Sequence, residues 1–143
     1  MRRLALITGL ALVCMAQPAA AEIGRIKSMV GEVVIQRGAT RIAAKPGFQL
    51  DQGDVVFTGK TGRVGIAFLD NTRMALGPGS RITVSEFAYD RARQTGSFVT
   101  SVERGSLGVV SGNIAKSKRD AMRVRTPTSM LGVRGTRFVV EVK

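Results

Sequence analysis

Hydrophobic and polar residues alternate with a period of two along most of the chain. The clearest example is segment 62–70, in which every second residue is large and apolar. Successive side chains of a β-strand point to opposite faces, so such a segment buries one face and leaves the other small or charged. The alternating apolar residues are Val64, Ile66, Phe68, Met74, Leu76, Ile82, Val84, Met122, Val124, Phe138, Val140 and Val142. The pattern predicts an all-β domain of short strands.

Turn-forming residues separate these short runs, which is typical of tight turns between strands. Segment 62–76 is predicted to be a β-hairpin, because Asp70 and Asn71 tolerate positive φ and join two runs that are in phase to pair. The other turn formers are in segments 51–54, 59–62, 77–80, 111–113 and 132–135 and at Gly105. Helix is expected only as a single turn at Ile114–Arg119.

Three glycine-bounded apolar phrases recur, at 31–38, 53–59 and 105–112. Regular recurrence of this kind is found in solenoids, whose rungs stack to bury a shared core. Strands that alternate with turns in a sandwich or barrel would give the same phrases. The fold class is therefore all-β, with a solenoid-like or a sandwich arrangement of the strands both open.

The first 21 residues have the features of a cleavable signal peptide. Arg2 and Arg3 precede the apolar stretch Leu4–Met15, and Ala19–Ala21 forms an A-x-A site. A membrane anchor is the alternative, but a span needs roughly 20 apolar residues and this stretch is shorter. We expect cleavage between Ala21 and Glu22, which leaves residues 22–143 as one exported domain with no transmembrane segment.

Cys14 is the only cysteine and lies inside the apolar stretch. Lipidation of Cys14 is disfavoured, because that signal requires a small residue before the cysteine and Leu12 and Val13 precede it. The exported domain is therefore expected to contain neither a thiol nor a disulfide, and its stability must come from packing.

The charge is strongly positive. Of 22 Lys and Arg residues only Arg2 and Arg3 leave with the signal, so 20 basic and 10 acidic residues remain, a formal charge of +10. Such a charge attracts anions. Nucleic acid is not an expected partner of an exported protein, which leaves anionic lipid headgroups, acidic glycans and acidic proteins. The alternative is that the charge only keeps the protein soluble.

The inventory of side chains argues against catalysis. The chain has no histidine, which removes His-activated nucleophiles and the common zinc sites. Asp51 and Asp54 are close enough to act as an acid-base pair or to bind calcium, but they flank Gly53, where Asp commonly binds turn amides. A carboxylate hydrolase is the remaining enzymatic hypothesis and the weakest one. We expect no catalytic residue, metal or cofactor.

The glycine-rich tail is not a phosphate loop, because no helix is predicted after it. Gly132 and Gly135 suggest a backbone that a Cβ would strain, and Pro127 fixes φ at the start of a turn. Arg134 has two interpretations: its guanidinium binds nearby carbonyls or carboxylates, or it reaches a partner. A charge in a tight turn is suited to local hydrogen bonds, so we favour the first.

Four phrases occur in order, at residues 49–84, 87–98, 104–116 and 123–142. Together they resemble the FecR domain family, and specifically its single-domain exported forms. The motif positions that carry the resemblance are Gly53, Asp54, Thr126, Pro127, Gly132, Arg134, Gly135 and Thr136. Because the chain lacks the cytoplasmic segment and the transmembrane helix of the signalling forms, the resemblance does not extend to direct transmission of a signal to a sigma factor.

The resemblance implies an all-β, solenoid-like module of protein-protein contact in the periplasm of a Gram-negative bacterium. The motif residues would then be structural or would bind the partner. The leading hypothesis is a non-enzymatic binding or regulatory module whose partner is an envelope protein. The alternative is a module that binds an acidic glycan or an anionic lipid headgroup.

Overall fold

The computed structural model describes residues 21–135 and 137–143. The predicted signal peptide up to Ala20, and the motif residue Thr136, lie outside the described residues. One short helix, α1 (Asn113–Ser117), interrupts a series of strands. The strands are β1 (Glu22–Val30), β2 (Val33–Arg37), β3 (Thr40–Ala43), β4 (Gln49–Asp51), β5 (Val55–Thr58), β6 (Arg63–Phe68), β7 (Arg73–Leu76), β8 (Arg81–Asp90), β9 (Thr95–Val110), β10 (Met122–Arg125), β11 (Met130–Val133) and β12 (Arg137–Val142).

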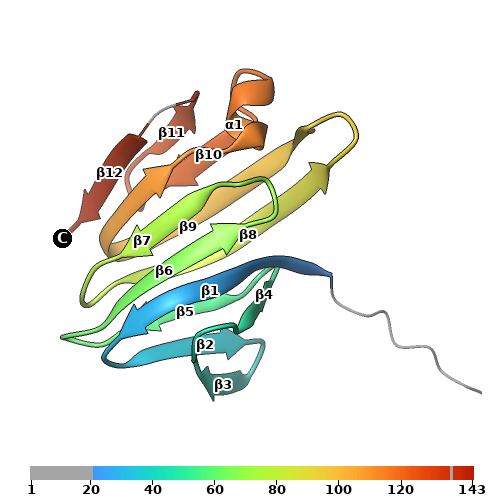
Figure 1. Ribbon diagram of the computed structural model, residues 1–143. Coiled ribbons are helices and arrows are strands. Elements are labelled where there is room, and N and C mark those ends of the chain that lie inside the picture. The colour runs from blue at the N-terminus through green and yellow to red at the C-terminus, as the bar shows by residue number, and fades with distance from the viewer. Residues whose placement is uncertain (1–20, 136) are drawn as a thin grey trace, which may run out of the picture.

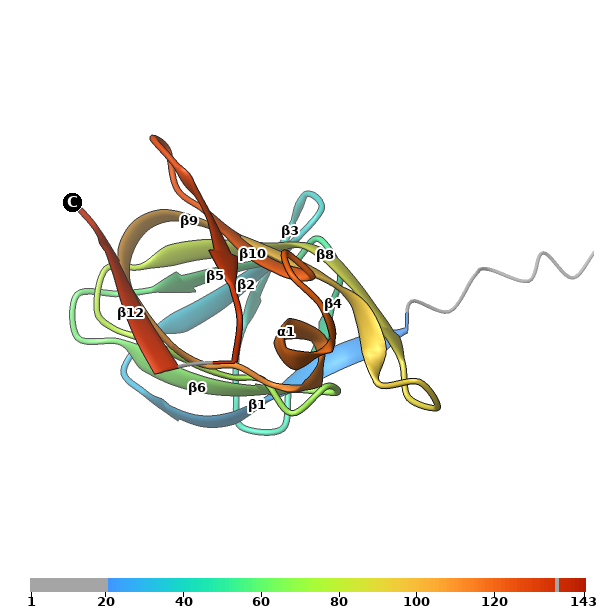
Figure 2. The same cartoon turned by 90° about the horizontal axis from the view of Figure 1, so that it is seen from above.

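The strands form one curled, mainly antiparallel sheet that surrounds the core (Figures 1 and 2). Along its main path the strand order is β3-β2-β5-β8-β9-β7-β6-β1-β4. The long strand β9 divides the sheet into two layers. Its first part pairs with β8 and, in parallel, with β10, which in turn pairs with β11. Its second part lies between β7 and β12.

Gly105 is the point at which β9 passes from one layer to the other. Its φ is +89°, a left-handed conformation that side chains other than glycine rarely adopt. A Cβ at Gly105 would also collide with the backbone and side chain of Ser80. The hydroxyl of Ser80 donates to the carbonyls of Gly77 and Ser106 and accepts from the amide of Ser106. The sequence placed Gly105 in a turn, whereas the structure places it at a bend inside a strand.

Three phenylalanines from different strands occupy the centre of the core. Phe68 of β6, Phe87 of β8 and Phe98 of β9 have ring centroids 4.8 to 5.8 Å apart, with two of the three pairs edge to face. Edge-to-face and offset contacts are the favoured geometries of aromatic pairs. The trio therefore joins the two layers across the interior, with the β-branched and leucine side chains of the inward faces packed around it.

The structure confirms the all-β fold and most of the alternation. Val64, Ile66 and Phe68 are buried, and the chain reverses between β6 and β7 with Asn71 at φ +68°, as the hairpin prediction requires. The predicted helical turn is α1. In the last strand Val140 is buried, whereas Phe138 and Val142 are only half-buried.

The arrangement of strands left open by the sequence is an antiparallel curled sheet. Glycine-bounded phrases 31–38 and 53–59 contain β2 and β5, which are antiparallel neighbours and therefore not stacked parallel rungs. Phrase 105–112 contains the second part of β9, in the other layer. The recurrence thus marks strands that end at glycine turns or bends.

Asp70 connects the β6–β7 turn to α1. Its fully buried carboxylate accepts hydrogen bonds from the amide and hydroxyl of Thr72, at 3.1 and 2.8 Å, and from the amide of Ile114 at 3.3 Å. The Asp70 carbonyl accepts from the amide of Asn113. These bonds fix the start of α1 against the turn. Within the described part of the chain, no helix has the length and apolarity of a membrane span.

Candidate functional site

The clearest candidate site is the free edge of the sheet at the C-terminal strand. Among residues 21–135 and 137–143, β12 pairs on one side only, with β9, and β11 pairs only with β10. The two strands diverge, β12 toward the C-terminus and β11 from the tip of the β10–β11 hairpin (Figure 2). A hollow of about 520 Å³ lies between them, lined by Thr126–Ser129, Leu131 and Val139–Lys143. We call these residues the edge groove.

Exposed apolar side chains flank the edge groove. Val139 is 77% exposed, Met130 48% and Leu131 43%. Single exposed apolar residues are common on protein surfaces, but several of them beside an unpaired strand edge are typical of interaction sites. An unpaired edge also carries backbone N–H and C=O groups that a further strand can bind. The edge groove therefore combines backbone hydrogen-bonding capacity with apolar surface.

Two of the motif residues form the tip of the β10–β11 hairpin. The amide of Thr126 donates to the carbonyl of Ser129 at 2.8 Å, and the Thr126 hydroxyl accepts from the Ser129 amide at 3.1 Å. The hydroxyls of the two residues are also 2.9 Å apart. Pro127 follows Thr126 in this turn and has no amide hydrogen to leave unbonded. The motif thus rigidifies one wall of the edge groove.

Gly132 lies within strand β11, opposite Arg123, and not in a turn as the sequence suggested. A Cβ there would collide with the carboxylate of Asp120, which is the mobile end of a side chain. The glycine therefore allows Asp120 to lie against β11. No left-handed backbone is required at this position.

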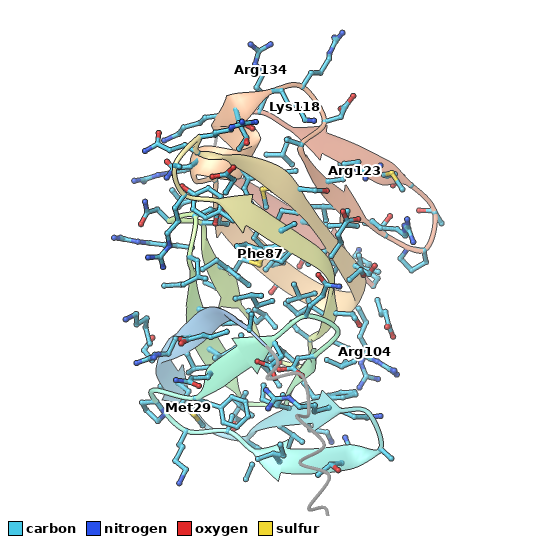
Figure 3. All side chains as sticks on the ribbon, turned by 90° about the vertical axis from the view of Figure 1, so that its right-hand side faces the viewer. Met29, Phe87, Arg104, Lys118, Arg123 and Arg134 are labelled. Atoms are coloured by element: carbon cyan, nitrogen blue, oxygen red, sulfur yellow. The ribbon has the colours of Figure 1, made fainter. Side chains whose placement is uncertain are left out.

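Gly135 does adopt the positive φ that the sequence predicts, at +62°. Its neighbour Arg134 is exposed, and its side chain makes no hydrogen bond or ion pair with any described residue. In Figure 3, Arg134 and Lys118 extend from the same end of the molecule, away from Phe87 in the core. The geometry thus gives no support to a local stapling role for Arg134, which was the interpretation we favoured.

Replacement of Gly135 by valine is expected to lower the free energy of unfolding by about 1–3 kcal/mol, through backbone strain alone. A Cβ at this position would meet only the Lys116 side chain, at 3.7 Å, which is an ordinary contact. Urea unfolding of the variant and the wild-type protein measures the difference. Equal midpoints would show that the turn adapts without strain.

Gly53 and Asp54 lie in a different place, at the turn between β4 and β5. Gly53 has φ +90°, and its amide donates to the carbonyl of Val84 at 2.7 Å. The buried carboxylate of Asp54 accepts two hydrogen bonds from the Arg37 guanidinium, at 2.9 and 2.8 Å, and one from the amide of Asp51. The hydrogen bond to Asp54 raises the pKa of Arg37. This cluster is structural, and its carboxylates are committed to the turn.

The motif residues therefore do not converge on one site. Thr126 and Pro127 belong to the edge groove, Gly132 to Gly135 lie in the chain between its two lining segments, and Gly53 with Asp54 stabilises a turn elsewhere. Sequence reasoning missed Met130 and Leu131, and it treated Val139 only as the outward neighbour of core residues. The available signal was that Val139 is a large apolar residue at a solvent-facing position of an alternating strand.

Comparison with protein families identifies the family of the chain. The sequence matches the FecR protein family over residues 54–143, which is more than half of the chain. The chain belongs to the FecR family. No curated protein and no solved structure gives a match. FecR proteins act in signalling and regulation at the cell envelope. The matched region runs from Asp54 through the edge groove to the C-terminal residue.

Proposed function

We propose that this FecR-family protein is a non-enzymatic binding module of the periplasm, which holds an extended segment of an envelope protein in its edge groove. The observation that carries the proposal is the unpaired edge of β12 beside exposed apolar residues. In β-strand addition, main-chain hydrogen bonds give affinity and alternate side chains give specificity. The partner strand would pair with β12 and cover Leu131 and Val139.

The surrounding structure supports such binding. The β10–β11 hairpin stands opposite β12 and is closed at its tip by the Thr126–Ser129 hydrogen bonds. A preorganised wall reduces the entropy that binding costs. The core position of Val140 and the pairing of β12 with β9 fix the receiving strand. Binding of a segment would therefore extend an existing layer without rearrangement of the core.

The same geometry argues for a regulatory role over catalysis. Within the described residues, no group of three or more His, Cys, Asp or Glu residues could hold a metal ion. The carboxylates best placed to act, Asp54 and Asp70, are buried and bound by turn and loop amides. A module that captures a partner segment fits the signalling and regulatory role of the family. Export after cleavage at Ala21 would place it in the periplasm.

Site-specific photo-crosslinking in intact cells tests the edge groove. A photoreactive amino acid at Leu131 is expected to form an adduct with one envelope protein, and mass spectrometry of the adduct should map the contact to one short segment. Leu69 provides the control, since it is a similarly exposed leucine, 37% against 43%, in the β6–β7 turn. Adducts of equal yield from both positions, or none from Leu131, would refute the proposed site.

A further inference from the structure

The outer face of the second layer carries a row of arginines that the edge groove does not use. Register places Arg25 of β1 opposite Ala67, Ala67 opposite Arg73, Arg73 opposite Val110, and Val110 opposite Arg137. Arginines therefore occur on β1, β7 and β12, at every second strand. Since neighbouring strands lie about 4.8 Å apart, successive arginines of the row start roughly 10 Å apart.

Small residues fill most of the next row of the same face, which ends at the larger Val139. Ser28, Gly65, Ala75, Gly108 and Val139 lie opposite one another across the five strands. Three hollows of about 370, 400 and 400 Å³ lie along these rows and share lining residues with one another. We call the two rows, with Lys27 and Arg63 at their margin, the arginine face. It belongs to the layer that contains β1, β6 and β7 (Figure 1).

Most cations of the arginine face lack a partner within the protein. Lys27, Arg63, Arg73 and Arg137 are exposed, and none of them takes part in an ion pair or side-chain hydrogen bond with a described residue. Arg25 alone is paired, with Glu22 at 2.9 Å. The other acidic residues on these strands are Glu141, on the same side of β12 as Arg137, and Glu103, in the first part of β9. The face is thus a linear array of available positive charge.

From this arrangement we propose that the arginine face binds a linear acidic polysaccharide, laid across the strands along the row of small residues. Charge complementarity with the unpaired arginines selects a polyanion. The direction of the row, perpendicular to the strands, excludes pairing as an added β-strand. The regular separation of the arginines fits a polymer whose charges recur at a fixed interval, and guanidinium groups bind carboxylates in a planar, two-point geometry.

The composition of the floor favours a glycan over a protein or a membrane. Protein partners are usually anchored by aromatic or large apolar side chains in pockets, whereas Ser28, Gly65, Ala75 and Gly108 form the middle of the floor. The exposed valines Val30 and Val139 lie only at its ends. The adjoining hollows form a trough along the row of arginines, which does not match a flat lipid surface. An acidic polysaccharide is a thin chain of sugar rings that carries hydroxyls and carboxylates. The small residues of the floor leave room for such a chain.

Binding of polygalacturonate to the protein purified from cells that express the full chain tests the proposal. We expect binding that weakens as salt is raised and no binding of neutral dextran. The double variant R73Q/R137Q should lose about tenfold in affinity. The matched control R91Q/R119Q removes the same charge from other exposed sites and should keep affinity within about twofold. Equal losses in the two variants would overturn the site.

A second variant tests whether polygalacturonate binding depends on the shape of the arginine face as well as on its charge. A Cβ at Gly108 would meet only the Ala75 carbonyl oxygen, at 3.9 Å, so Gly108→Leu should fold normally and fill the trough. We expect it to weaken polygalacturonate binding without any change in net charge. Unchanged binding by Gly108→Leu would overturn the proposed path, and so would equal affinity for polyglutamate or for phosphatidylglycerol vesicles. Crosslinking from Leu131 does not depend on any of these results.

Discussion

Replacement of Gly105 by alanine is expected to lower the free energy of unfolding by about 4 kcal/mol, a large share of the stability of a small domain. Two costs combine at this residue. The left-handed backbone, at φ +89°, strains any side chain, and the new Cβ would collide with Ser80 on the neighbouring strand. The Ser80 hydroxyl would then lose its bonds at 2.8 and 3.2 Å to the carbonyls of Gly77 and Ser106.

Gly108→Ala is the matched control, three residues later in the same strand. Its φ is not positive, and the added Cβ would lie 3.9 Å from the nearest heavy atom. We expect its urea midpoint to stay close to that of the wild type, while that of Gly105→Ala falls sharply. Similar midpoints for the two variants would show that the bend in β9 can be made without glycine.

Replacement of Arg37 by methionine is the second substitution with a large expected effect, a loss of about 3 kcal/mol. The carboxylate of Asp54 is 1% exposed and would keep only the amide of Asp51 as a donor. Methionine retains apolar contact with Phe48, over which the guanidinium now lies at 5.5 Å. This loss of stability is at the lower end of the range for removal of one partner of a buried ion pair, because the Arg37 side chain is 40% exposed.

Arg41→Met provides the comparison for this variant. Arg41 also lies over a phenylalanine, Phe57, at 4.9 Å, but it has no ion pair with a described residue. We expect little change in its chemical denaturation curve. The raised pKa of Arg37 means that its contribution is complete at neutral pH and is lost only as the pH rises through strongly alkaline values. If Arg37→Met lost no more free energy of unfolding than Arg41→Met, the stabilising role of the Arg37–Asp54 pair would be disproved.

Local features of the fold were predictable from the sequence because neighbouring residues determine them. Alternation identified the inward residues of β6, and the Asp70–Asn71 turn identified the hairpin. Gly105 was harder, since glycine marks both turns and bends. Only the approach of Ser80, from a distant part of the chain, distinguishes them.

The candidate sites depend on pairing that the sequence pattern does not contain. The edge groove exists because β12 pairs with β9 and no described strand pairs with its other side. The arginine face needs the register of five strands to align Arg73 with Arg137. A shift of one residue would turn these side chains to the opposite face, so their sequence positions alone predict nothing about the row.

The double role of β9 determines how the protein gains and loses its order. A single strand supplies hydrogen-bond partners to β8 and β10 in one layer and to β7 and β12 in the other. Neither layer is complete until this strand is in place, and detachment of the strand opens both. We therefore expect the domain to fold as one cooperative unit, slowly because its contacts are non-local, and only once the chain through β12 is available.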